Sequence, residues 1–153
     1  MAAPDIVKGS YIDILMGDGN TVPGPETFTP ICGLTARNIT EQVNTNDVFV
    51  PDCDDPELVP VRRLVPTGQQ WDISGEGLLN LANRADVRAA KGVTKNYRFV
   101  IGRPAGSIVG AGYYEGPAML TNLQIGGTAG NGEFASTNLT IASDGAWTWT
   151  DAV

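Results

Sequence analysis

Four carboxylates in the middle of the sequence could bind a cation. They occur within six residues, at Asp52, Asp54, Asp55 and Glu57. Grouped carboxylate oxygens are the ligands that Ca²⁺ prefers, but the EF-hand loop needs a fixed spacing and a glycine at its bend. Pro56 breaks that spacing, and no glycine stands among these acids. We therefore expect no metal at this cluster and no cofactor in the protein.

Residues for most other forms of catalysis are missing or poorly spaced. The chain has no histidine, which removes the most frequent general base near neutral pH. Its two cysteines, Cys32 and Cys53, form no CxxC pair, so the sequence indicates reduced thiols rather than a zinc or redox site. A pair of acids that hydrolyses glycosides leaves no local motif, and that alternative stays open. We predict that the protein is not an enzyme.

Two tryptophans near the end of the chain offer a different chemistry. Trp147 and Trp149 are two residues apart, which would place both side chains on one face of a strand. Such a pair could stack on sugars, so a carbohydrate-binding module is the alternative function. We expect the two rings instead to lie in the core or in a contact between subunits.

The distribution of charge limits the possible partners. The net charge is -7, and residues 1–57 contribute -8, residues 58–103 contribute +5 and residues 104–153 contribute -4. A protein with few cations cannot neutralise many phosphates, which argues against tight binding of nucleic acid. Segregated charge can mark two surfaces that attract each other, either within one chain or between copies of it. Alternatively, the charged segments form solvated faces whose charges cancel within one fold.

These residues must be positioned mainly by short strands. Alternating apolar and polar residues predict strands at 11–16, 28–33, 34–44, 70–75, 97–101, 113–125 and 133–142. The turn at 143–146 predicts a tight hairpin with residues 147–149. We expect one domain over residues 1–153, without a signal peptide or a membrane-spanning helix. The predicted fold is mainly β, an antiparallel β-sandwich or barrel of about seven to nine strands with one flanking helix.

The helix is expected at about residues 78–91. Its apolar stripe would consist of Leu78, Leu81, Ala82, Ala85 and Ala89, which recur at helical spacing. Gly92 would end it. Before it, residues 51–68 contain four prolines and charges of both signs, which predicts a long exposed loop. Loops of that length in compact domains are often functional.

Two of the predicted strands have a polar but uncharged face. In the first it consists of Asn38, Thr40, Gln42 and Asn44, and in the second of Ser136, Asn138 and Thr140. Alternation places Ile39, Val43, Leu139 and Ile141 on the opposite, buried side. The polar faces could also be ordinary solvated surfaces.

The order of these features resembles a known family. The features involved are an opening strand with a glycine-rich turn (residues 11–19), the Ile31–Cys32–Gly33–Leu34 segment, the Ser74–Gly75–Glu76–Gly77 strand end and the late segments 116–123, 132–139 and 142–145. Together they resemble the major tail tube proteins of long-tailed phages and of gene transfer agents. The proline-rich loop looks denser in proline than that family would suggest.

This resemblance implies a structural virion protein without enzymatic activity. It implies a β-sandwich that assembles into stacked six-membered rings, forming a tube for DNA, and partners that include tape measure, tail terminator and distal tail proteins. Assembly would take place in the bacterial cytoplasm. We expect the two polar faces to line the lumen, and the acidic stretch with Arg62 and Arg63 to contact the neighbouring ring. A virion-decorating module is the alternative within this setting.

Overall fold

The described part of the chain folds into a single antiparallel sheet of eight strands with one short helix. The computed structural model describes residues 8–19, 25–82, 84–102, 110–130 and 132–151. A 3-10 turn at Gly9–Tyr11 precedes the first strand. The strands are β1 (Ile12–Gly17), β2 (Phe28–Pro30), β3 (Leu34–Val50), β4 (Val61–Leu78), β5 (Thr94–Ile101), β6 (Gly112–Gly126), β7 (Ser136–Ser143) and β8 (Thr148–Asp151), and the helix is α1 (Arg84–Ala90).

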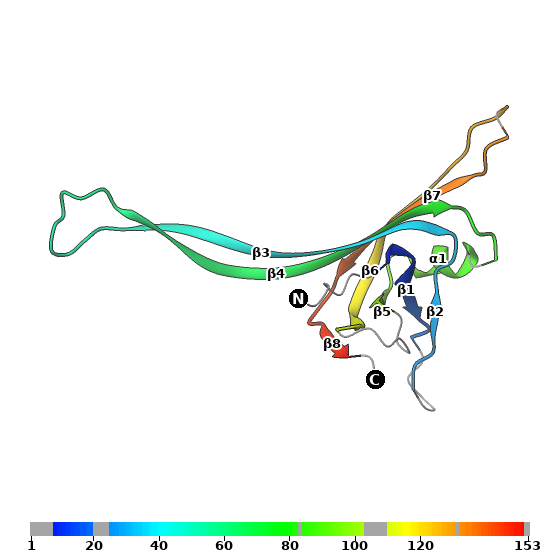
Figure 1. Ribbon diagram of the computed structural model, residues 1–153, viewed down its shortest axis with the longest axis horizontal. Helices are drawn as coiled ribbons and strands as arrows, with labels where there is room; N and C mark the ends of the chain where they lie inside the picture. Colours follow the sequence, from blue (N-terminus) through cyan, green and yellow to red (C-terminus); the bar gives the residue numbers. More distant parts are fainter. Residues whose placement is uncertain (1–7, 20–24, 83, 103–109, 131, 152–153) are drawn as a thin grey trace, which may run out of the picture.

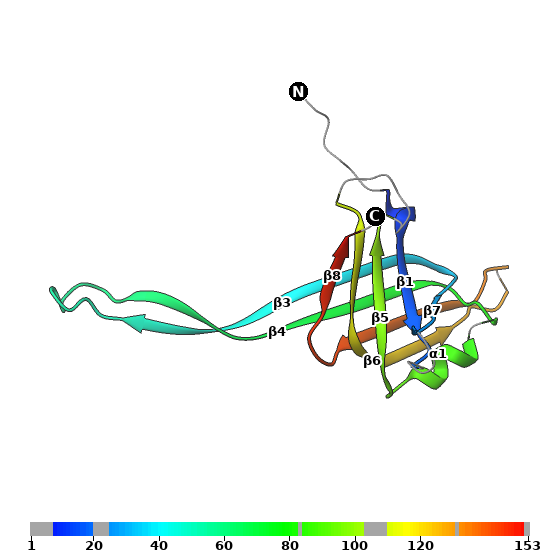
Figure 2. The ribbon, with the colours of Figure 1, turned by 90° about the horizontal axis from the view of Figure 1, so that it is seen from below.

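Strand β6 joins the two halves of this sheet. The strand order is β2-β1-β5-β6-β7-β4-β3, with β8 also paired to β6. The first half of β6 pairs with β5 and β8, and its second half, from Ala118 onward, pairs with β7. The sheet therefore folds over on itself, and the strands of one half cross those of the other (Figures 1 and 2). This arrangement confirms the predicted mainly β, antiparallel fold.

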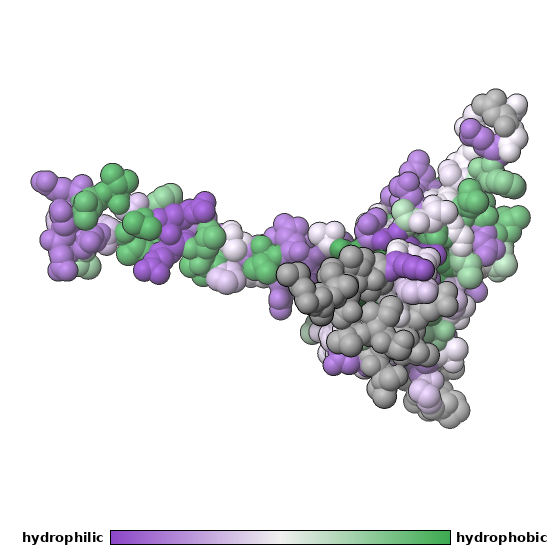
Figure 3. Space-filling view, in the orientation of Figure 1, coloured by the Kyte–Doolittle hydropathy of each residue, from purple (hydrophilic) through white to green (hydrophobic). Residues whose placement is uncertain are grey.

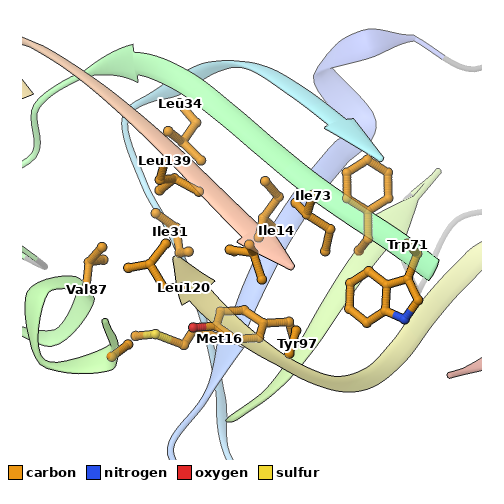
Figure 4. Close-up of a cluster of buried hydrophobic side chains, with 14 residues drawn as sticks. Ile14, Met16, Ile31, Leu34, Trp71, Ile73, Val87, Tyr97, Leu120 and Leu139 are labelled. Carbon is orange, nitrogen blue, oxygen red and sulfur yellow. The ribbon is translucent and has the colours of Figure 1, made fainter. Parts of the chain in front are cut away.

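The core fills the space between the two halves. Ile14 of β1 and Tyr97 of β5 meet side chains of β4, β6 and β7 (Figure 4). Phe99 of β5 belongs to the same buried cluster. The buried residues on that second side are Trp71, Ile73, Leu120, Leu139 and Ile141. These buried residues occupy alternate positions along their strands, because successive side chains of a strand point to opposite faces of the sheet. Burial of each such side chain contributes about 1.5–3 kcal/mol.

The predicted helix at 78–91 is too long and its apolar stripe is wrong. Strand β4 continues to Leu78 because its last residues pair with both β3 and β7. Leu81, placed in the stripe, is 74% exposed, whereas the helix buries Val87 and Ala90. Pairing on both edges of a strand outweighs a weak helical preference. Gly92 follows the helix in the left-handed region, at φ 76°, and Gly is the residue that adopts this conformation at low cost.

The predicted hairpin between residues 142 and 149 is also wrong. Strand β8 pairs with the start of β6, Gly112–Glu115, and not with β7. Strand β7 already has β4 on one edge and the second half of β6 on the other. No edge of β7 therefore remains for β8, which continues along β6 instead.

The loop predicted at 51–68 is shorter than expected. It covers residues 51–60, because β4 begins at Val61 and pairs with the end of β3 from Val50 backward. Strands β3 and β4 extend far beyond the rest of the sheet (Figure 1). We call residues 41–69 the arm, and every side chain in it is exposed. The prolines at 51, 56 and 60 lie in the loop, and Pro66 lies at a register shift, where pairing is already disturbed.

Candidate functional site

The polar residues predicted on β3 and β7 lie on one face of the sheet. Asn38 pairs with Ser74 of β4, Ser74 pairs with Thr140 of β7, and Thr140 pairs with Asn122 of β6. Paired residues point to the same side of a sheet. The four side chains therefore form one row across four strands, on the side away from the core.

Neighbouring rows extend this surface, which we call the polar face. Glu76 lies opposite Asn138, and Asn138 opposite Gln124, while Thr40 lies opposite Asp72. Two hydrogen bonds run along the strands on this face, from Gln70 Nε2 to Asp72 Oδ2 at 3.2 Å and from Gln42 Nε2 to Asn44 Oδ1 at 3.4 Å. Its members are Asn38, Thr40, Gln42, Asn44, Gln70, Asp72, Ser74, Glu76, Asn122, Gln124, Ser136, Asn138 and Thr140.

The only charged side chains of the polar face are the carboxylates of Asp72 and Glu76. The nearest cation in sequence, Arg37, is on the opposite side, where it bonds the carbonyl oxygens of Ile12 and Leu34 and lies 3.3 Å from the Asp13 carboxylate. Strand β4 also contributes to the polar face, which was not predicted from the sequence. The alternation of Gln70, Asp72, Ser74 and Glu76 with Trp71 and Ile73 could have predicted it. This alternation has the same period of two residues as in β3.

The opposite side of the same strands is buried only over the body of the protein. Leu139 and Ile141 are fully buried and Ile39 is half-buried, as predicted. Val43 is 56% exposed, so the prediction that it is buried is wrong. Beyond Glu41, whose carboxylate still accepts a hydrogen bond from Trp147, strand β3 has passed the edge of the other half of the sheet, and Val43 is left exposed.

The arm carries the residues predicted for contact with a neighbour. Asp52 and Asp55 shape its tip, because Asp52 Oδ1 accepts hydrogen bonds from the amides of Asp54 and Asp55, and Asp55 Oδ1 accepts one from the amide of Glu57. Arg62 and Arg63 lie on β4, not in the loop, opposite Phe49 and Val48. The acids and the two arginines thus occupy one end of the molecule.

None of these charged residues of the arm forms an ion pair with another residue that the structure describes. The two salt bridges in the described part of the protein join Arg37 to Asp13 and Arg98 to Glu115, the latter at 3.5 Å. The described residues contain no group of three potential ligands that could hold a metal ion. The same residues contain no helix long and apolar enough to cross a membrane.

Trp147 and Trp149 make ring contacts within the chain rather than forming a shared platform. The Trp147 ring lies edge-on to buried Trp71 at a centroid distance of 6.1 Å, and its Nε1 donates to Glu41 Oε1 at 3.0 Å. The Trp149 ring packs on Tyr114 at 4.8 Å, and its Nε1 donates to Asp151 Oδ1 at 2.7 Å. Each indole stabilises a different pair of strands.

A comparison with families decides what kind of protein carries these surfaces. The sequence model of the phage tail tube protein family matches residues 7–148. The chain belongs to this family. A search of curated protein sequences found no significant match.

Solved structures show the same fold. One similar chain is from the virion of a native gene transfer agent particle, with a TM-score of 0.70 and 22% identity, covering 95% of this chain and 99% of that one. A second is from the tail of an empty gene transfer agent particle with C6 symmetry, at 0.69 and 24%, with the same coverage. A third is from the SPP1 tail tube, at 0.64 and 8%, covering 95% of this chain and 81% of that one.

This tail tube protein is therefore a structural component of a virion tail, as the resemblance implied. Membership of the family confirms the predicted structural function and the predicted place in the tail. The family is a structural one rather than a family of enzymes. The surfaces that remain to be explained are the polar face and the arm.

Proposed function

We propose that this tail tube protein forms six-membered rings that stack into a tube, with the polar face lining the lumen through which DNA passes. The observation that carries the proposal is the row of uncharged polar side chains across four strands, from Asn38 through Ser74 and Thr140 to Asn122. Tight binding of DNA requires lysine and arginine side chains to neutralise phosphates. A face with two carboxylates and no cation repels DNA weakly and lets it slide.

The free edges of the sheet support closure of a ring. Strand β3 pairs only with β4 in the described part of the chain, so its outer edge presents unpaired backbone groups over 17 residues. At the other end of the same surface, β6 pairs with β5 only as far as Met119, which leaves the outer edge of residues 122–126 without a strand. Long open edges favour pairing with another chain. Joining β3 of one copy to the end of β6 in the next would continue the polar face around a barrel.

The arm supports contact between rings. Its exposed acids and the Arg62–Arg63 pair have no ionic partner in the described part of the chain, although charges of both signs are concentrated there. Complementary charge on a neighbouring ring would fix the register of stacking. The ends of such a tube would meet tape measure, tail terminator and distal tail proteins, and assembly would take place in the host cytoplasm before completion of the virion.

The test of the lumen is the double variant Asn38→Lys and Thr140→Lys. These positions are two strands apart through Ser74, so the new cations would lie about 10 Å from each other. Each ring of six would gain about twelve positive charges facing the DNA, and each phosphate contact strengthens binding in a salt-dependent way. We expect tubes of normal diameter by electron microscopy and slower delivery of DNA by virions that carry the variant.

The matched control is Asn38→Gln with Thr140→Gln, which adds length but no charge. It should deliver DNA at the rate of the unmodified protein. Normal delivery by the lysine variant, in tubes that have assembled normally, would contradict the assignment of the polar face to the lumen. Purified protein that forms neither rings nor tubes at high concentration would contradict the proposed assembly itself.

A further inference from the structure

Three β-bulges interrupt the pairing of the described strands, and at each of them one strand has one residue more than its partner. Leu34 and Ala36 of β3 lie opposite the adjacent residues Gly77 and Glu76, so the residue between them is the additional one. The same comparison of partners locates the additional residue at the other two bulges. These residues are Thr35 in β3, Thr67 in β4 and Thr121 in β6.

All three additional residues are threonines, and their hydroxyl groups make the same kind of contact. Each donates a hydrogen bond to a backbone carbonyl oxygen of the strand opposite the bulge. The three bonds run from Thr35 Oγ1 to Glu76 at 3.3 Å, from Thr67 Oγ1 to Asn44 at 3.1 Å and from Thr121 Oγ1 to Thr140 at 3.3 Å. A bulge disrupts the ladder of backbone hydrogen bonds locally, so a side-chain donor at that point restores a bond between the two strands.

The bulge at Thr121 decides which face the second half of β6 presents. Leu120 is 1% exposed and lies in the core, whereas Asn122 lies on the polar face opposite Thr140. Residues two apart in a regular strand point to the same face of a sheet. Because the bulge adds one residue between the two faces, Asn122 and Gln124 lie on the polar face instead of the core side.

A slip that removes this bulge would exchange the two faces of the strand end. Leu123, which lies opposite Leu139, would then lie opposite Asn138 on the polar face. Leu123 and Ile125 would also leave an apolar groove beside α1 that both of them line. Burial opposes the slip only weakly, because Ile125 is already 44% exposed. Apolar surface is in fact visible at this end of the molecule (Figure 3).

The bulges at Thr35 and Thr67 set the limits of the polar face on the other two strands. Leu34 is 3% exposed and lies in the core, whereas Ala36 is paired with Glu76 on the polar face. Pairing is regular from Ala36–Glu76 to Asn44–Gly68, and the bulge at Thr67 follows directly. All the polar-face residues of β3 and β4 lie within this regular stretch. The polar face therefore begins and ends at bulges.

We propose that Thr35, Thr67 and Thr121 are positioning residues that fix the register of the sheet, and that their hydroxyl groups thereby select the side chains of the polar face. The observation that carries the proposal is that each bulge holds a threonine whose hydroxyl bonds the opposite strand. The inference goes beyond the proposed function. It concerns how the polar face forms within one chain, and it holds whether or not that face lines a lumen.

Two pairs of cysteines that share one position report the register at Thr121. In a background in which serine replaces both native cysteines, Gln124→Cys with Asn138→Cys places thiols on residues that are opposite in the structure. Leu123→Cys with Asn138→Cys places them on residues that become opposite only after a slip by one residue. Directly opposite residues are close enough for a disulfide. The extent of disulfide formation in a glutathione buffer therefore measures each register at equilibrium.

We expect the first pair to form a disulfide and the second to remain reduced while Thr121 is present. Thr121→Val keeps the shape of the side chain and favours a strand, but it has no donor. Loss of one hydrogen bond changes an equilibrium constant by about 2- to 12-fold, so the ratio of the first disulfide to the second should fall by that factor. Thr121→Ser keeps the hydroxyl and should restore the ratio of the unmodified protein.

The matched control is Thr137→Val. Thr137 Oγ1 donates to the carbonyl oxygen of Gln124, also at 3.3 Å and between the same two strands, but at a point of regular pairing. This control should leave the ratio of the two disulfides unchanged. The measurement uses dilute, unassembled protein, so failure of the proposed assembly would not affect it. A ratio that Thr121→Val leaves unchanged, or that Thr137→Val lowers as much, would overturn the proposal.

Discussion

The most direct test of the assigned faces compares two adjacent residues of β7. Leu139 is 1% exposed and belongs to the core cluster with Ile73 and Ile141, whereas its neighbour Asn138 is exposed on the polar face. Substitution of Leu139 by alanine removes buried methyl groups and leaves a cavity, which costs about 2.7–5 kcal/mol at comparable sites. Substitution of Asn138 by alanine removes only exposed atoms and should change the free energy of unfolding by less than about 0.5 kcal/mol.

The expected difference is large enough to measure by two methods. A loss of about 3 kcal/mol in a chain of this length lowers the melting temperature by roughly 6–12 °C, while Asn138→Ala should melt within about 2 °C of the unmodified protein. Urea unfolding of dilute, unassembled protein should show a lower midpoint for Leu139→Ala with an unchanged slope. The low concentration matters because assembly would add its own stabilisation.

The reasoning would be refuted by equal effects of the two substitutions. It would also be refuted if Asn138→Ala were the more destabilising of the two, because the polar face would then be part of the core. Delivery of DNA gives the complementary measurement. Among variants that still assemble, changes on the polar face should alter delivery, and changes on the core face should alter stability.

Two further substitutions test the packing of the body. Gly77→Ala should destabilise the protein by about 1–3 kcal/mol or more. A β-carbon at this position would lie 2.7 Å from Leu34 Cα and would meet the Gly33 carbonyl oxygen. The control is Gly68→Ala on the same strand, where the added β-carbon would meet nothing within 4 Å. Tyr97→Phe should stabilise the protein by about 1 kcal/mol in thermal unfolding, since the buried Tyr97 hydroxyl has no hydrogen-bond partner among the described residues. Burial raises the pKa of Tyr97 from 10.0 to about 12, so the folded state keeps a proton that the unfolded state loses. The unmodified protein should therefore lose stability between pH 10 and pH 12 relative to Tyr97→Phe, and equal pH dependence of the two would contradict the assigned burial.

The faces of the strands could be predicted from the sequence because alternation is a local property. Asn38, Thr40, Asn138 and Leu139 each lie on the predicted side of their strand, since a period of two leaves only two choices. The tail tube family could also be identified at this stage, from the order of strands, turns and glycines. The same alternation in residues 70–76 would have added β4 to the polar face.

Partners of strands could not be predicted, because pairing depends on residues far apart in the sequence. The turn at 143–146 indicated a hairpin, but β7 has neighbours on both edges and β8 pairs with β6. Leu78 fits a helical stripe, yet pairing with Ser136 keeps it in β4. Local preferences of a few tenths of a kcal/mol do not outweigh two ladders of hydrogen bonds.

The order of residues alone was enough to predict that this protein is an acidic chain of β-strands with polar and apolar faces. It also determined the kinds of charge that lie near residues 52–63 and 84–95. Folding of the whole chain places the first group at the end of a long two-stranded arm and the second around α1, at the opposite end of the molecule. The reason is that distance between segments, and the edges left free by pairing, are set by the whole sheet.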